Sequence, residues 1–495
     1  MNNNNSRQIR LILYIMALAV FMSFCIDMAN NTLHQSAFFG TIIVLFMLYI
    51  AFRKTVSCDA VIWTMLLGAF VKASYILYTP VWERQHDVID FGTGEGHAAY
   101  IEYILSNKAL PDFDPRQVWA FFQPPLHHTV CAALMYVEIR LKIAERRLYE
   151  NVQILPLCYM LILTLVIYNI CLELKLSTKA TLVAMLAVSF HPVYILMSGS
   201  INNDALALML SAVAVYVALL WNRKPTLFKI ILLGICVGLA MMAKLSSGLI
   251  APGIGVMMLY RVIKDIKDKK KSLLSYIVQL VLFAIVVVPL GLWWPIRNYI
   301  KWRMPFNYIP EVGEQLVKTD MFSRIFDIRT STVYPCLVSN GDAYDEYNVL
   351  LAMFKTAFFG ESNFSQLSPK IAPFAGIVFV FGIVLALIGI AFAVYVCIRK
   401  DSGLEIGEKI LFGGVLAGLM GGYFSFALSY SNFSAQDFRY SALAVSILAI
   451  FTAIVYEKMI QKGSKLRYLI LALSVIFALG AFGTYMLVGF YQVQY

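Results

Sequence analysis

The chain has 495 residues, of which 60% are hydrophobic and 14% are charged, and its formal net charge is +11. Repeated apolar runs of roughly 18 to 25 residues are long enough to cross a ~30 Å hydrocarbon core, so they predict an all-α polytopic membrane protein. The basic residues lie mostly in short loops and form no stripe with interleaved aromatic residues, which excludes nucleic acid as an expected partner and favours contact with membrane lipids.

Taken in chain order, the apolar runs predict about thirteen transmembrane helices in a single integral membrane domain, residues 1–495. The expected spans are roughly 10–28, 36–52, 59–78, 152–171, 180–197, 204–220, 228–243, 246–260, 273–292, 372–398, 409–429, 440–456 and 467–490. They divide the chain into three N-terminal spans (1–79), an outer loop (80–151), a six-span core (152–292), a second large outer loop (293–371) and four C-terminal spans (372–495).

The basic loops predict the orientation. With the N-terminus in the cytoplasm, every short basic loop lies inside, including the Lys-rich run 261–271, as the positive-inside rule requires. Counting 125–143 as a span would move that run outside, so we expect 125–143 to be an interfacial helix. Residues 97–108 have a similar amphipathic pattern, and the first outer loop is therefore expected to carry two surface helices.

Polar side chains gather on the predicted outer side. The segment 81–128 alone contains four of the six histidines and many carboxylates, and Asp204, Lys244, Arg297 and Arg439 also fall at outer helix ends. Each has a structural alternative: Asp204 could cap a helix, Lys244 could reach the headgroups, Arg297 could anchor an aromatic belt, and Arg439 could simply pair with Asp437. Their shared side predicts chemistry at the outer face.

The order of the polar motifs resembles that of GT-C glycosyltransferases, the polytopic class that includes protein O-mannosyltransferases and aminoarabinose transferases (glycosyltransferase family 39-like). The matching pieces are HDVIDFGTGEGHAAYIEYI (86–104), the Leu-Pro pair (110–111), FFQPPLHH (121–128), HP…SGSINNDAL (within 191–207), AKL (243–245), WWPIRNY (293–299), KTAFFGE (355–361) and QDFRY (436–440). The resemblance implies transfer of a sugar from a polyprenyl-phosphate donor to a hydroxyl group of a glycan, lipid or protein acceptor, with inversion. It also implies a bacterial plasma membrane protein whose active site faces outward.

The resemblance implies roles for individual residues. Asp87 is the favoured general base and Glu95 the alternative, because the family's Asp-Glu pair is replaced here by His86-Asp87 and Gly94-Glu95; Asp204 matches a second acidic position. The donor phosphate would be held by Lys244, Arg297 and Arg439. Further substrate-binding residues would be His86, His97, Gln123, His127, His128, Asn203, Asn298, Glu361 and Asp437.

A metal and a second function stay open at this stage. No cofactor is implied with certainty, but His86, Asp87, Glu95 and His97 could together hold a divalent cation such as Mg²⁺ or Mn²⁺. The alternative function is a transporter or flippase of lipid-linked saccharides. A transporter should place ionisable groups near the middle of its spans, whereas the predicted polar groups gather at the outer ends.

Overall fold

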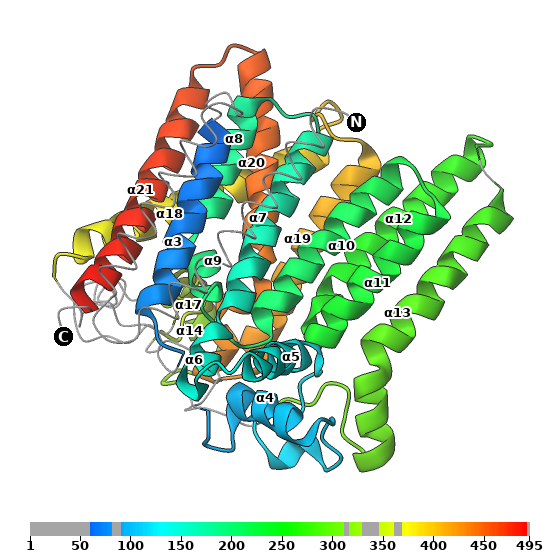
Figure 1. The fold of residues 1–495 in the computed structure, drawn as a ribbon. Helices are drawn as coiled ribbons and strands as arrows, with labels where there is room; N and C mark the ends of the chain where they lie inside the picture. The colour runs from blue at the N-terminus through cyan, green and yellow to red at the C-terminus, as the bar shows by residue number, and fades with distance from the viewer. Residues whose placement is uncertain are drawn as a thin grey trace.

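The computed structural model describes residues 60–81, 91–270, 272–310, 316–328, 346–360 and 369–492, and the regular elements in these residues are all helices. Nine helical segments of this part of the chain are long and apolar enough to cross a membrane. Figure 1 shows the long helices side by side in one bundle. The predicted all-α membrane fold is therefore confirmed.

The described α-helices fall into a long group and a shorter group. The long ones are α3 (Ala60–Tyr78), α7 (Ile154–Glu173), α10 (Asp204–Arg223), α12 (Ala251–Lys267), α13 (Leu273–Trp302), α18 (Ala372–Ile398), α19 (Ile406–Ser429), α20 (Leu443–Gln461) and α21 (Leu466–Gln492). The shorter ones are α4 (Gly96–Asn107), α5 (Leu126–Arg140), α6 (Glu145–Asn151), α8 (Thr178–Phe190), α9 (Pro192–Met197), α11 (Leu227–Ala243), α14 (Met321–Phe326) and α17 (Val349–Phe359).

The predicted spans agree with these helices wherever they can be compared. The spans expected at 10–28 and 36–52 lie outside the described residues. Each of the other eleven coincides with a helix: the nine long segments, and the shorter apolar helices α8 and α11. The total of thirteen stays a prediction.

The span expected at 180–197 is broken in two. Helix α8 ends at Phe190, and α9 begins at Pro192 after a residue of extended backbone, His191. A residue that precedes proline is disfavoured in the helical conformation, and proline itself fits the first turn of a new helix. The His191 ring accepts the Val193 N–H at 3.3 Å and so caps α9.

Helix α13 continues beyond its expected end at 292 into the segment that was assigned to the second outer loop. It contains Pro289 and Pro295 and ends only at Trp302, where Arg303 adopts a left-handed conformation. The added turns contact the first loop, because the Trp294 indole N–H donates to the Phe122 carbonyl at 3.2 Å. The motif WWPIRNY is therefore helical.

Helices α4, α5 and α6 form a layer at one end of the bundle (Figure 1). Helix α5 packs against α4, α6 and α11. It does not cross the bundle, as the orientation argument requires, and its exposed side chains include Val137 and Leu141. The interfacial position of α4 and α5 and the outward orientation of this end stay predictions.

Close helix packing positions the segments next to the site. Helices α12 and α19 approach until a Cβ atom on Gly253 would lie 2.5 Å from the Gly414 carbonyl carbon, so only glycine fits there. Small residues at such a contact are the usual means of bringing membrane helices together. The contact fixes the segment 244–250, which leads into α12, beside the segment 430–441, which follows α19.

Candidate active site

Asp204 is the first residue of α10, at the end of the bundle that carries α4 and α5. Its side chain is buried and meets two cations. The Lys244 ammonium group donates to Oδ1, and Nε of Arg439 lies 3.4 Å from Oδ2. The structure thus joins three residues that are far apart in the sequence and that were all predicted to belong to the site.

Lys244 and Arg439 are each held by a short helix at the end of a span. Lys244 follows α11 in an extended conformation and precedes the 3-10 helix η2 (Leu245–Ile250). Arg439 lies in the 3-10 helix η6 (Phe438–Ser441), where the side chain of Asp437 accepts the Arg439 backbone N–H at 2.8 Å. Asp437 Oδ2 also lies 3.8 Å from Nε of Arg439. Two carboxylates and two cations therefore balance one another in a buried group.

Tyr440 completes this group, although the sequence analysis gave it no role. Its ring centroid lies 4.6 Å from Nζ of Lys244 and 5.0 Å from the guanidinium carbon of Arg439. A cation above a tyrosine ring is attracted by the negative face of the ring. The Tyr440 side chain therefore stabilises both charges, and its place next to Arg439 in QDFRY is the signal that could have identified it.

A large cavity of about 760 Å³ lies against Lys244 and Tyr440. Its walls come from α13, α19, the turn 119–124 and the segment 304–310. Aromatic side chains from all four line it, namely Trp119, Phe122, Trp294, Phe306, Tyr308 and Phe426. The cavity therefore combines a long apolar space with a cation at one side, and it also reaches His97 and Gln123.

Histidines of α4 and α5 lie near Asp204, and His97 also lines the cavity. His97 Nδ1 and His128 Nε2 are 2.7 Å apart, and the two rings are stacked. His127 Nε2 lies 2.7 Å from the Ile201 carbonyl oxygen, just before α10. His97 is also close enough to Asp204 to act on it electrostatically. His97 and His127 are therefore within electrostatic range of Asp204, and His128 contacts His97.

These histidines are expected to make the protein sensitive to acid. Burial lowers the pKa of His127 to about 4, and burial together with the neighbouring His97 lowers the pKa of His128 well below its usual range. The unfolded chain protonates histidine near pH 6.5, so below that pH the unfolded state binds more protons than the folded state. The free energy of unfolding should then fall by up to about 1.4 kcal/mol per pH unit for each ring.

Thermal unfolding of the detergent-solubilised protein at pH 7 and pH 5 measures this effect. We expect a lower Tm at pH 5 and a smaller drop in His128→Phe, which keeps a stacked ring but cannot take up a proton. An equal Tm at the two pH values would show that these rings are not buried in the neutral form.

Gln123 and Asn203 join the turn before α5 to the start of α10. The Asn203 amide donates to Gln123 Oε1 at 3.3 Å and to the Ala243 carbonyl at 2.8 Å. Asn203 therefore connects the residues immediately before Asp204 and Lys244. Its contacts place it as a support for the site, while Gln123 faces the cavity.

Arg297 lies in a different cluster from Lys244 and Arg439. It donates to the Pro111 carbonyl at 2.6 Å and to Asp112 at 3.1 Å, and Lys301 pairs with the same carboxylate. The guanidinium also donates to Asn298 Oδ1 at 3.1 Å. Arg297 thus fastens α13 to the first loop. The sequence analysis placed Arg297 with Lys244 and Arg439, because nothing in WWPIRNY indicates that Asp112 is the partner of Arg297.

Of the two candidate bases, the structure describes Glu95 but not Asp87. Asp87 lies outside the described residues, as do His86 and Glu361. Glu95 is exposed and occupies the cap position before α4 without a capping hydrogen bond. Within the described residues, no three His, Cys, Asp or Glu side chains gather as metal ligands. The choice of base and the metal dependence stay predictions.

A buried ion pair supports the segment that carries Arg439. Lys355 of α17 lies 2.9 Å from Glu346, and both side chains are essentially inaccessible. Gln436 donates to the Glu346 carbonyl at 2.8 Å, and the Phe438 N–H donates to Thr356 at 3.0 Å. Helix α17 therefore positions 436–440. The single lysine in the apolar stretch LLAMFKTAFF was the available signal, since an ionised residue there requires a partner.

Comparisons with known proteins bear on this site. The sequence profile of the family described as dolichyl-phosphate-mannose-protein mannosyltransferase matches residues 132–293. The resemblance to GT-C glycosyltransferases is confirmed over that stretch. It contains Asn203, Asp204 and Lys244, whereas the acidic first loop and Arg439 lie outside it. No curated protein matches the chain in sequence.

Two of the solved structures that are similar to this chain are those of an oligosaccharyltransferase and of ArnT. The oligosaccharyltransferase of Archaeoglobus fulgidus, in complex with zinc and sulfate, has 16% identity and a TM-score of 0.47, over 87% of this chain and 53% of its own. The chain thus spans about half the length of that protein. ArnT from Cupriavidus metallidurans, bound to undecaprenyl phosphate, has 16% identity and a TM-score of 0.40, over 87% of this chain and 77% of its own.

Proposed function

We propose that the protein is a membrane glycosyltransferase that moves a sugar from a polyprenyl phosphate to an acceptor hydroxyl group at the outer face of the membrane. The observation that carries the proposal is the convergence of Lys244 and Arg439 on Asp204 beside the 760 Å³ aromatic cavity. The family profile that matches residues 132–293 is named for a lipid-phosphate-linked sugar, which supports the same class of donor.

The donor phosphate would lie at Lys244, whose side chain is 14% exposed and borders the cavity. An ammonium group is a mobile donor of hydrogen bonds to phosphate, while a guanidinium group offers a planar fork that suits two phosphate oxygens. Arg439 would supply that fork from the buried side. The polyprenyl chain would occupy the 760 Å³ aromatic cavity, which we call the donor cavity, where its apolar surface leaves water.

The transfer step is a single displacement. The acceptor oxygen forms a bond to the anomeric carbon as the bond from that carbon to the phosphate oxygen breaks. The polyprenyl phosphate departs with the electron pair, and Lys244 and Arg439 offset its growing negative charge. The acceptor proton passes to a carboxylate, either Asp87 or Glu95. One displacement inverts the configuration of the sugar, because no enzyme-bound intermediate intervenes.

Asp204 has a positioning role in this proposal. Both of its oxygens face cations, so its negative charge is already compensated and it is a poor proton acceptor. Its carboxylate instead holds Lys244 and Arg439 together before the donor arrives. A preorganised pair of cations stabilises the transition state without rearrangement, which is the main advantage of such sites.

A divalent cation remains compatible with this scheme, but no step requires one. A hard cation needs several oxygen ligands. Asp204 and Asp437 are both engaged with Arg439. Of the four predicted ligands His86, Asp87, Glu95 and His97, the first two lie outside the described part of the chain. Metal binding therefore belongs to the prediction about the first loop and not to the cation pair.

Transfer activity tests the proposal directly. The purified protein in nanodiscs is incubated with radiolabelled polyprenyl-phosphate sugars and membrane acceptors, and Lys244→Gln serves as the variant. We expect label to reach the acceptor and Lys244→Gln to bind undecaprenyl phosphate about 10-fold more weakly or worse, since a charge-assisted hydrogen bond contributes ~1.5–3 kcal/mol.

Reconstituted liposomes separate this function from the alternative. Movement of the labelled lipid across the liposome bilayer, without transfer to any acceptor, would favour the transporter. Arg399→Ala, an exposed change at the opposite end of the bundle, is the control and should retain donor binding.

A further inference from the structure

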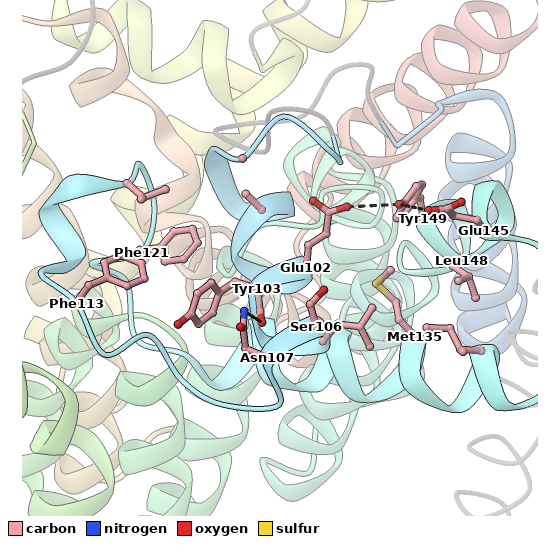
Figure 2. Close-up of a pocket in the computed structure, with 15 residues that line it drawn as sticks. Glu102, Tyr103, Ser106, Asn107, Phe113, Phe121, Met135, Glu145, Leu148 and Tyr149 are labelled. Carbon is pink, nitrogen blue, oxygen red and sulfur yellow. Dashed lines mark hydrogen bonds between the residues drawn. The ribbon is translucent and has the colours of Figure 1, made fainter.

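A second cavity, of about 570 Å³, lies within the layer formed by α4, α5 and α6 (Figure 2). We call it the outer-loop pocket; its lining includes Tyr103, Phe113 and Phe121 at one end and Glu102, Glu145 and Tyr149 at the other. Its volume falls in the range of ~300–1,000 Å³ that is common for small-molecule sites. The transfer mechanism above does not use this pocket.

One end of the outer-loop pocket is aromatic. The ring centroids of Tyr103, Phe113 and Phe121 lie 5.6 to 5.7 Å from one another, so the three rings form a compact group. Figure 2 shows these rings together at one end of the pocket. Aromatic surface of this kind suits a ligand with an apolar face, such as the C–H face of a sugar ring.

The other end is polar and already ordered. The Tyr149 hydroxyl oxygen lies 3.2 Å from Glu145 Oε1 and 3.4 Å from Glu102 Oε1, as the dashed lines in Figure 2 show, and its single proton can be donated to either carboxylate. Glu102 also accepts the Gly92 N–H at 2.9 Å, and the Phe91 ring stacks on Tyr149 at 4.2 Å. Carboxylate oxygens accept several hydrogen bonds each, so this wall can bind hydroxyl or ammonium groups without first being organised.

The charges of the two cavities are opposite. Among the described residues, the outer-loop pocket has Glu102 and Glu145 in its lining and neither lysine nor arginine, whereas the larger cavity has Lys244 and neither aspartate nor glutamate. A phosphate would be repelled by the two carboxylates and attracted by the lysine. The outer-loop pocket therefore selects against the donor phosphate and in favour of a neutral or cationic ligand.

We propose that the outer-loop pocket binds a neutral or amino-bearing saccharide, which is the acceptor glycan of the transfer reaction. Its aromatic end would pack against a sugar ring, and Glu102, Glu145 and the exposed side chains of Ser106 and Asn107 would bind hydroxyl or amino groups. The identification of this saccharide as the acceptor rests on the proposed function. Binding of a saccharide to the pocket can be measured independently of transfer.

The position of the pocket agrees with an acceptor site. Gly94, which immediately precedes the candidate base Glu95, lines it. Helix α4 contributes to both cavities, with His97 facing the donor cavity and Tyr103 facing the outer-loop pocket. The turn 118–124 does the same, so one helix and one turn divide the two cavities. A glycan in the pocket would thus lie beside the loop that supplies the base.

A blocking variant tests the site. Ser106 is exposed and lines the pocket, so Ser106→Trp should fill it without disturbing the core, while Gln117→Trp places the same side chain at an exposed position that is not part of the lining. Saturation-transfer NMR and calorimetry would measure binding of neutral, amino-bearing and uronic trisaccharides to the full-length protein in nanodiscs. Tm confirms that both variants fold.

We expect neutral or amino-bearing trisaccharides to bind the wild type and Gln117→Trp, and Ser106→Trp to bind them at least 10-fold more weakly while still binding undecaprenyl phosphate. The inference is wrong if Ser106→Trp binds these saccharides as well as the wild type does, if the uronic trisaccharide is preferred, or if no trisaccharide binds. It is also wrong if the pocket is occupied by a phosphatidylethanolamine headgroup or a peptide. If saccharides bind as expected but no donor supports transfer, the proposed function fails and the saccharide site stands.

Discussion

Arg439→Ala is expected to reduce sugar transfer by about 10²- to 10³-fold, the cost of removing one preorganised donor from a developing negative charge. Arg439 is the buried cation of the pair, and only Lys244 would remain to hold the departing phosphate. Donor binding should weaken as well, because the phosphate is present in the ground state. Initial transfer rates and undecaprenyl phosphate titration measure the two effects separately.

Misfolding must be distinguished from loss of the contact. Removing Arg439 leaves Asp437 and Asp204 with one cation between them, and an unpaired buried carboxylate costs ~3–5 kcal/mol of stability. Arg439→Lys keeps the charge but not the planar fork. It should restore Tm toward that of the wild type while transfer stays impaired. Recovery of transfer in full would mean that only the charge, and not its geometry, is used.

Asp87→Asn is expected to lower turnover by about 10²- to 10⁴-fold while leaving donor binding intact. The substitution keeps the size of the side chain and removes the basic oxygen. Asp87 lies outside the described residues, so this expectation rests on the sequence motif and on the finding that Asp204 is already paired with cations. Single-turnover transfer with saturating donor is the appropriate measurement.

Glu95→Gln is the comparison that decides between the two bases. Glu95 is exposed at the start of α4, next to the outer-loop pocket. If Asp87→Asn transfers at a near-normal rate and Glu95→Gln does not, Glu95 is the base. If both variants transfer at a near-normal rate, neither carboxylate removes the proton, and another group of the site must be the base.

Hydropathy predicted the helices well because the length of an apolar run decides whether a segment can cross a membrane. It predicted where α13 begins, but its last turns could not be predicted. The run becomes polar at Arg297, and the helix persists there through contacts with Pro111, Asp112 and Phe122, which lie far away in the chain. Local sequence carries no information about such partners.

For the candidate site too, the sequence identified individual residues but not the contacts between them. Asp204, Lys244 and Arg439 were each recognisable as ionisable residues at the ends of spans. Their mutual contact depends on the packing of α10, α11, α12 and α19. The glycines 414, 418 and 422 recur every four residues and indicate a close helix contact along α19, but they do not identify Gly253 and Leu249 as its partners. Arg297 was equally recognisable, yet the structure joins it to Asp112.

Helix α13 places the donor cavity close to the lipid phase. It stands at one edge of the bundle in Figure 1, and only 11% of its most apolar window is buried by the described residues. Its outer end nevertheless supplies Trp294 and Pro295 to the cavity wall. Among the described helices, α13 is the one that stands between the cavity and this edge of the bundle.

A polyprenyl tail is as apolar as the acyl chains, so passing beside α13 exchanges one hydrocarbon contact for another. Only the phosphate and the sugar would have to leave the headgroup region, and Lys244 would bind the phosphate at the cavity. The free energy of binding is therefore concentrated in the few polar atoms at which the bond is broken. In the proposed function, the tail would keep the substrate in the bilayer, and Lys244 and Arg439 would bind its phosphate.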